Sequence, residues 1–553
     1  MRMHRVLATL ALLITALPCA AQRPNILLLM AEDMSARVGA FGDALASTPH
    51  LDALAAQGVR YPNTFTTAGV CAPSRAAHIL GMYQISTGTQ HMRASGAPGG
   101  GYRAVPPARA KAYPELLRAA GYYTYTDHKL DYQFSGTLWN SGPFTIWDDE
   151  GFGTHWRERP ADAPFFGFVN FNVTHESGVF TPLGNWPHSV VHFGSQLIRA
   201  LTSPDIELDN PTRPEQVVLP PYYPDTPTVR ADLARHYDNI AIMDAQVGEL
   251  LASLEEDGLA DSTIVIWTTD HGDGLPRAKR ELFDSGIRVP MIIRWPAAFR
   301  PEGVPPHGVD TRLVSFVDLA PTILGLAGVA VPDYMQGRDF LHDAPRQYIF
   351  AARDRIDEVP DRQRAARDRR FKYIRSWYPQ QPGGHALQFR DNIAMAREMR
   401  TLYEAGELDS MQRQWFEPPG RERLFDTRND PFELRDLSGD PGHALVLARL
   451  RGALDGWLAR VPDWSEQPEA QMAAQFQRGG APGPTPAPRL SLVDGRVRIE
   501  GAEGASLGYR VDESAWKLYT GPVVLLPGQA LAAKAVRYGY DESEEVELRL
   551  PLE

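Results

Sequence analysis

Short apolar runs that end in polar clusters recur along the chain and predict a parallel sheet. Residues 25–30, 121–126, 165–171 and 263–268 each have the character of a strand, and the first is apolar on both faces. Apolar residues at helical spacing over 229–257 predict a long helix. Because strands alternate with helices, we expect an α/β fold with a mostly parallel sheet and helices on both faces.

Polar side chains follow each of these strands directly. They are, in chain order, Glu32, Asp33, Lys129, His175, Asp270 and His271. In open α/β sheets, ligands bind beyond the carboxyl ends of the strands. We therefore expect these strand ends to share one site. A shorter helix after the first strand is predicted to begin at Pro49, with Thr48 as its N-cap, and to stop near Gly58.

The composition of the chain changes towards its C-terminus. The predicted sheet occupies residues 22–345, and residues 346–476 are predicted to form a smaller α+β subdomain, with a strand at 371–376. Glycine and proline dominate 477–489, which is typical of a linker. Short alternating runs over 490–553 predict a small β-sandwich.

The N-terminus has the pattern of an export signal. Residues 1–21 combine a basic start, an apolar stretch over 6–17 and small residues, so we expect cleavage after this segment and a periplasmic or secreted protein. The stretch is shorter than the roughly 20 apolar residues that cross a bilayer, so we expect no transmembrane span. A lipid anchor on Cys19 is the alternative, but Pro18 before it is unlike a usual lipobox.

Composition and charge exclude several classes of protein. The 553 residues, 43% hydrophobic and 22% charged, are too many for a small disulfide scaffold and too apolar for global disorder. The net charge of −12 argues against nucleic acid or an anionic membrane as a bulk electrostatic partner. Without Cys19, Cys71 is the one remaining cysteine and can form no internal disulfide. It is either a buried small apolar residue or a functional one.

The residues around Cys71 favour the functional interpretation. Pro73 and the apolar residues after it predict a helix, with Cys71 at the N-terminal end, where backbone N–H groups can hold an anion. The stretch from Cys71 to Arg75, C-x-P-S-R, resembles the signature of the sulfatase family. The order of Glu32-Asp33, Asp270-His271, Lys279 and a Gly-Ile-Arg-Val-Pro segment is also that of the family, and the resemblance covers roughly residues 23–440.

The resemblance implies an alkaline-phosphatase-like fold and a set of roles. In the family the cysteine is oxidised by a maturation enzyme to formylglycine, whose hydrate is the nucleophile. The implied catalytic residues are Cys71, Arg75, Lys129, His175 and Lys279. The implied ligands of a divalent cation are Glu32, Asp33, Cys71, Asp270 and His271. Three carboxylates favour a hard ion, and the resemblance favours Ca²⁺, with Mg²⁺ as the alternative.

Two positions depart from the family pattern. Many sulfatases have K-x-H after the second strand, whereas this chain has Lys129-Leu130-Asp131. The histidine that helps to release sulfate is therefore missing, and Asp131 is our candidate for the base that replaces it. Glu32 stands where aspartate is commoner, which adds one methylene to a predicted metal ligand.

The sequence predicts the substrate only as a chemical class. Segments such as 121–123 and 370–375 are similar to those of heparan N-sulfatase-like enzymes, which favours a sulfated carbohydrate such as a glycosaminoglycan and leaves O- and N-sulfate open. Basic residues are candidates for an anionic subsite or for exposed charge. They are His91, Arg93, Arg277, Arg280 and Arg353. The C-terminal sandwich resembles small β-domains of glycan-degrading enzymes, which either dock on the body or bind sugar. The alternative functions are a phosphate or phosphonate ester hydrolase and a non-catalytic sulfated-glycan-binding protein.

Overall fold

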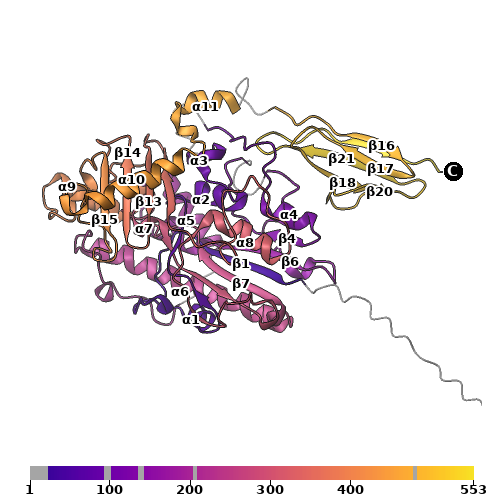
Figure 1. The fold of residues 1–553 in the computed structure, drawn as a ribbon. Helices are drawn as coiled ribbons and strands as arrows, with labels where there is room; N and C mark the ends of the chain where they lie inside the picture. Colours follow the sequence, from indigo (N-terminus) through magenta and orange to yellow (C-terminus); the bar gives the residue numbers. More distant parts are fainter. Residues whose placement is uncertain (1–22, 93–100, 135–141, 203–207, 477–482, 553) are drawn as a thin grey trace, which may run out of the picture.

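The computed structural model describes residues 23–92, 101–134, 142–202, 208–476 and 483–552 (Figure 1). The predicted leader with Cys19, the candidate Arg93 and the first part of the predicted linker lie outside these residues. Within the described ranges, no helix is both long enough and apolar enough to cross a membrane.

A mixed, mostly parallel sheet of eight strands forms the centre of the molecule (Figure 1). The strand order is β10-β2-β9-β7-β1-β6-β4-β5. The strands are β1 (Asn25–Ala31), β2 (Val59–Arg60), β4 (Tyr123–Thr126), β5 (Asp149–Glu150), β6 (Phe165–Phe171), β7 (Thr263–Thr269), β9 (Met291–Arg294) and β10 (Gly308–Val309). The four predicted strands, β1, β4, β6 and β7, pair in parallel, whereas β9 runs antiparallel to β7 and β2.

Helices cover both faces of this sheet, as the sequence predicts. Every residue of β1 is buried, and successive side chains of a strand point to opposite faces. Ile26 and Leu28 pack with α2 (Cys71–Leu80), α4 (Tyr113–Ala119) and α8 (Leu319–Leu326), whereas Leu27 and Leu29 pack with α1 (Pro49–Ala56) and α6 (Pro227–Glu256). The other α-helices are α3 (Gln84–Thr87), α5 (Val190–Thr202), α7 (Asp284–Ile287), α9 (Ala394–Glu404), α10 (Ala444–Leu458) and α11 (Glu469–Phe476).

The start of α1 corrects one prediction. Thr48 occupies the N-cap position, but its side chain makes no capping hydrogen bond and instead accepts one from Gly39 N at 3.0 Å. The free N–H groups of the first turn are satisfied by the carboxylate of Asp244 in α6, which accepts from His50 N at 3.0 Å and Leu51 N at 2.8 Å. The cap therefore comes from a distant helix.

Two smaller sheets accompany the central sheet. A four-stranded antiparallel sheet is packed against α10 through Leu450, Leu454 and Trp457. Its strands are β12 (Ile349–Arg353), β13 (Gln363–Arg367), β14 (Phe371–Ser376) and β15 (Glu422–Asp426). A three-stranded sheet joins β3 (Thr64–Phe65), β8 (Arg288–Val289) and β11 (Val314–Ser315).

The C-terminal region forms two antiparallel sheets, which lie beside the central body on the side of α4 (Figure 1). They are β16 (Arg489–Val493), β17 (Arg496–Glu500) and β20 (Val523–Val524), and β18 (Ser506–Val511), β19 (Lys517–Leu518), β21 (Ala530–Val536) and β22 (Val546–Arg549). The buried carboxylate of Glu115 in α4 accepts hydrogen bonds from Ser506 Oγ at 2.6 Å and Tyr538 OH at 2.9 Å. The sandwich is therefore docked on the body, one of the two roles that the sequence left open.

Candidate active site

The ends of β1 and β7 bring four predicted cation ligands together. Glu32 and Asp33 follow β1, and Asp270 and His271 follow β7. Backbone hydrogen bonds from Glu32 N to Phe171 O and from Asp270 N to Ala31 O, both 3.1 Å, extend the sheet to these residues. Asp33 N also donates to Asp270 Oδ1 at 3.0 Å. All four side chains are fully buried at one edge of the sheet.

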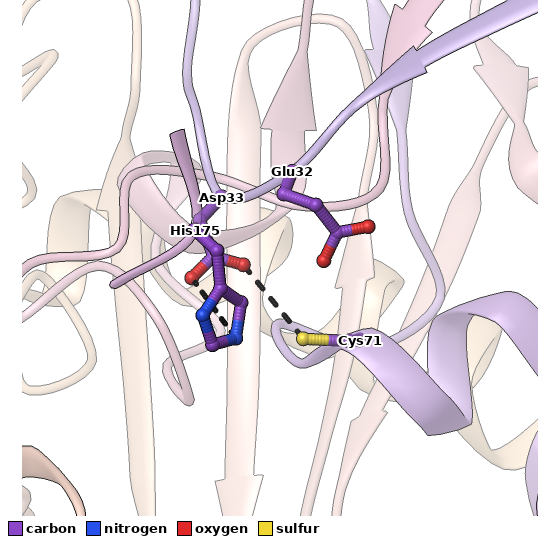
Figure 2. Close-up of side chains that lie close together, drawn as sticks. All are labelled: Glu32, Asp33, Cys71 and His175. Carbon is purple, nitrogen blue, oxygen red and sulfur yellow. Dashed lines mark hydrogen bonds and ion pairs between the residues drawn. The ribbon is translucent and has the colours of Figure 1, made fainter. Parts of the chain in front are cut away.

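Cys71 is the first residue of α2 and points into this cluster (Figure 2). Val70 before it is extended, so the chain turns into the helix at the cysteine. The sulfur lies 3.3 Å from His271 Nε2 and 3.7 Å from Asp33 Oδ1. The thiol is buried, but it lies among carboxylate and imidazole groups rather than in an apolar core.

Two basic side chains flank the other side of the cluster. Arg75, one turn after Cys71, contacts the Glu32 carboxylate and lies 3.4 Å from Asp270 Oδ2, while Lys129 Nζ lies 2.9 Å from Glu32 Oε2. Burial alone would raise the pKa of Glu32, but the charges of Arg75 and Lys129 hold that pKa well below its usual range. Glu32 is therefore ionised at neutral pH.

Lys279 lies between Asp33, which is close to Cys71, and His175. Its ammonium group lies 2.6 Å from Asp33 Oδ2, 2.9 Å from Glu176 Oε1 and 3.3 Å from His175 Nε2. Burial and the positive charge of Lys279 lower the pKa of His175 to about 3. His175 is therefore neutral at pH 7 before an anion enters, and its Nδ1 lies 2.9 Å from Ser177 Oγ.

The donor set fits a hard divalent cation. Ligand atoms of Asp33, Cys71, Asp270 and His271 all lie within 4.8 Å of one another, and so do those of Glu32, Asp33, Cys71 and His175. Asp270 Oδ2 is buried without a hydrogen-bond partner. Burial and the charge of Glu32 raise the pKa of Asp270, so the carboxylates repel one another here. A cation held between them would offset that repulsion and use the orphaned oxygen.

A cavity of about 880 Å³ opens above the cluster. Seven of the predicted residues line it: Cys71, Arg75, Lys129, Asp131, His175, Lys279 and Arg280. Arg280 is already neutralised by Glu176, at 2.8 Å, and by Asp357, at 2.8 Å. Asp131 Oδ1 accepts from Gln133 N at 2.9 Å.

Three candidates for the anionic subsite, His91, Arg277 and Arg353, do not line this cavity. Arg353 is buried and pairs with Glu281 at 2.5 Å. Arg277 stacks on the ring of Phe283 at 4.0 Å from its centroid, and buried His91 accepts from a backbone N–H through Nδ1. These side chains are used inside the fold, so we do not assign them to substrate.

Two residues that the sequence analysis did not select touch the site directly. Asn170 Oδ1 accepts from Arg75 Nη1 at 2.6 Å, and Glu176 pairs with both Lys279 and Arg280. The available signals were a polar residue within the apolar run of β6 and an acid next to His175. Without the fold, neither signal identifies these two residues as part of the site.

The sequence also matches known proteins. The model of the family described as Sulfatase matches residues 24–329, and that described as N-sulphoglucosamine sulphohydrolase, C-terminal, matches residues 277–418. An ulvan-active sulfatase of Formosa agariphila is 39% identical over 95% of this chain and 91% of its own length. The human N-sulphoglucosamine sulphohydrolase is 26% identical over 81% of this chain and 93% of its own length. The solved structure of a 2-O GAG sulfatase has the same fold, with a TM-score of 0.55 and 20% identity over 80% of this chain and 93% of that chain.

Proposed function

This chain belongs to the sulfatase family and is a sulfuric ester hydrolase, and we propose that it acts on a sulfated carbohydrate through a formylglycine made from Cys71. The observation that carries the proposal is the position of Cys71. It stands at the start of α2, in the lining of the cavity, 3.3 Å from His271 and 3.7 Å from Asp33. A maturation enzyme would supply the oxidation.

Each group at the site then has a chemical task. Bound Ca²⁺, with Mg²⁺ as the alternative, would be held by Glu32, Asp33, Asp270, His271 and residue 71, and would polarise a sulfate oxygen. Hydrated formylglycine supplies two hydroxyls, one to attack sulfur and one to lose its proton when sulfate is expelled. The positive charges of Arg75, Lys129 and Lys279 offset the charge of the incoming sulfate. Splitting the hydrolysis into two steps in this way is covalent catalysis.

His175 is positioned to give the departing oxygen or nitrogen its proton. Its Nε2 lies 3.3 Å from Lys279 Nζ at the cavity wall, and an anion bound there would raise its proton affinity. We expect His175→Ala to lower kcat for alkyl sulfates by about 10²- to 10⁴-fold. Aryl sulfates with acidic phenols leave without protonation and should lose much less. Equal losses on both substrates would reject the role, and His188→Ala, which removes another imidazole from the cavity wall, is the control.

Asp131 is our candidate for the base of the second step, because it lines the cavity where the family pattern has histidine. We expect Asp131→Asn to release one equivalent of alcohol rapidly and then to turn over about 10²- to 10³-fold more slowly than wild type. Stopped-flow measurement with an aryl sulfate resolves the two phases. Unchanged steady turnover would remove Asp131 from the mechanism, and Glu358→Gln, at another acid of the wall, is the matched control.

The names of the relatives support the proposed substrate class. One is called ulvan-active, and the other is called an N-sulphoglucosamine sulphohydrolase. We propose a sulfated glycan outside the cytoplasm as the substrate, in keeping with the predicted export signal over residues 1–21. Sulfate release from ulvan oligosaccharides and from N-sulfoglucosamine, measured side by side, tests the O-sulfate and N-sulfate alternatives.

The reaction itself has a direct test. Protein purified from a host that makes formylglycine should carry the oxidised residue 71, seen by mass spectrometry of its peptide. It should hydrolyse 4-nitrophenyl sulfate much faster than 4-nitrophenyl phosphate. A preference for the phosphate ester, or for a phosphonate ester, would favour the second candidate activity. Binding of sulfated glycan with no turnover by the oxidised protein would overturn the proposal.

A further inference from the structure

Helix α5 (Val190–Thr202) carries its polar side chains inward and its apolar side chains outward. The buried positions are His192 and Gln196, and Arg199 is half-buried. They recur at helical spacing and form one face. This is the reverse of the usual surface helix, whose apolar stripe faces the core.

The inward face is fixed by hydrogen bonds to the chain just after the catalytic histidine. Gln196 Nε2 donates to Thr181 O at 2.8 Å, and His192 Nε2 lies 3.0 Å from the same oxygen. Arg199 donates to Gly178 O at 2.5 Å and to Asn239. These contacts hold the polar face of the helix against the body, so its orientation is set and its apolar side is left at the surface.

The outward face is large. Trp186 is 93% exposed, Val190 87% and Leu201 83%. Other large apolar side chains exposed on this segment are Leu183, Val191, Phe193 and Leu197. Together they present on the order of 500 Å² of apolar surface, taking about 60 to 120 Å² for an aliphatic side chain and about 200 Å² for an aromatic one. Patches of this size mark binding surfaces on soluble proteins.

The side chains of this face indicate which kind of partner it binds. A helix lying on an anionic membrane has lysine and arginine on its polar side, whereas α5 has no lysine and its one arginine is bound within the protein. A sulfated glycan is anionic and polar. Trp186 and Phe193 could stack on a sugar ring, but the other five named side chains are aliphatic, and residues 183–202 contain no lysine to pair with sulfate. The remaining kind of partner is an apolar protein surface. A second copy of this chain, related by a two-fold axis, presents such a surface through its own α5.

We propose that α5 and the loop before it form the interface of a homodimer. Two copies of the face would bury on the order of 1,000 Å² of apolar surface, close to the roughly 1,200 Å² of total surface at which stable interfaces begin. His188, Ser189 and Val191 also line the catalytic cavity, so the partner copy stands at the rim of that cavity.

Sedimentation velocity of the purified protein over a range of micromolar concentrations tests the proposal, whether or not residue 71 is oxidised. We expect the wild type to sediment at twice the chain mass. Val190→Asp and Leu201→Asp each place a charge in the interface on both copies, so each should raise the dimer Kd by at least about a hundredfold. The unfolding free energy of the isolated monomer should be nearly unchanged, because both side chains are exposed within the monomer.

Leu445→Asp in α10 is the matched control, since Leu445 is 87% exposed but lies outside this face. It should leave the dimer intact. A wild type that stays monomeric at every concentration overturns the proposal, and so does a dimer that survives both aspartate variants. Binding of a monomeric wild type to neutral phosphatidylcholine vesicles would assign the face to a membrane instead, which also overturns it.

Discussion

Cys71→Ala is expected to abolish sulfate-ester hydrolysis while leaving the protein folded. The sulfur position is the only part of the cluster that can become the proposed nucleophile, and alanine has no atom there to oxidise. Loss of a covalent nucleophile costs on the order of 10⁴- to 10⁶-fold in kcat. The side chain is buried, but only one atom is removed, so the free energy of unfolding should fall by about 1 kcal/mol.

Hydrolysis of 4-nitrophenyl sulfate and thermal unfolding of the same preparations measure both parts of this prediction. Cys71→Ser is the closer control, because it keeps the size of the side chain and one hydroxyl but cannot form the hydrate in a host that oxidises only cysteine. It should be as inactive as the alanine variant. Wild-type rates in either variant, or active wild-type protein with an intact thiol at residue 71, would contradict the mechanism.

The sequence was sufficient to place the cluster because two local rules agree there. The run over 25–30 is apolar at every position but the first, which only a strand covered on both faces tolerates, and its end is marked by two acids. The strand at 263–268 has the same form and ends before Asp270. Since parallel strands present their carboxyl ends at one edge, the convergence of these acids follows from the fold class alone.

The sequence did not predict ion pairs and capping contacts whose two partners lie far apart along the chain. From the sequence, Arg353 was a candidate for a solvated or ligand-binding charge, but it pairs with Glu281, which is 72 residues away. Thr48 holds the N-cap position of α1, as predicted, but the capping hydrogen bonds come from Asp244, almost two hundred residues later. Such pairs depend on packing that no local pattern encodes.

The sequence also did not predict whether an individual strand runs parallel or antiparallel to its neighbours. Residues 291–294 form β9, a buried apolar strand in the middle of the sheet, and nothing in that segment distinguishes a parallel from an antiparallel neighbour. The antiparallel pairing of β9 with β7 follows a connection over residues 270–290, which places Lys279 and Arg280 in the cavity lining. That connection carries part of the site, so its path matters for function.

Asp33→Asn should have the second large effect, on both activity and stability. Asp33 is fully buried and its carboxylate accepts from Lys279 at 2.6 Å, lies 2.9 Å from His271 Nε2 and accepts from Glu176 N at 2.7 Å. Burial would raise its pKa, but the charge of Lys279 holds that pKa well below the usual range, so the group is an anion at neutral pH. Removing the charge leaves buried cations without their partner, which costs about 3 to 5 kcal/mol of unfolding free energy.

The comparison with Asp273→Asn separates the proposed metal-binding role of Asp33 from the effect of burial alone. Asp273 is also buried and pairs with Arg37 at 2.8 Å, but unlike Asp33 it belongs to neither group of candidate metal ligands among the described residues. Both variants should be destabilised, as denaturant titration will show. Only Asp33→Asn should lose the bound cation, measured by plasma emission spectrometry, and at least about 10³-fold in kcat, because the proposed metal and Lys279 both depend on that carboxylate. If Asp273→Asn loses the cation to the same extent, or Asp33→Asn retains it, the proposed ligand set is wrong.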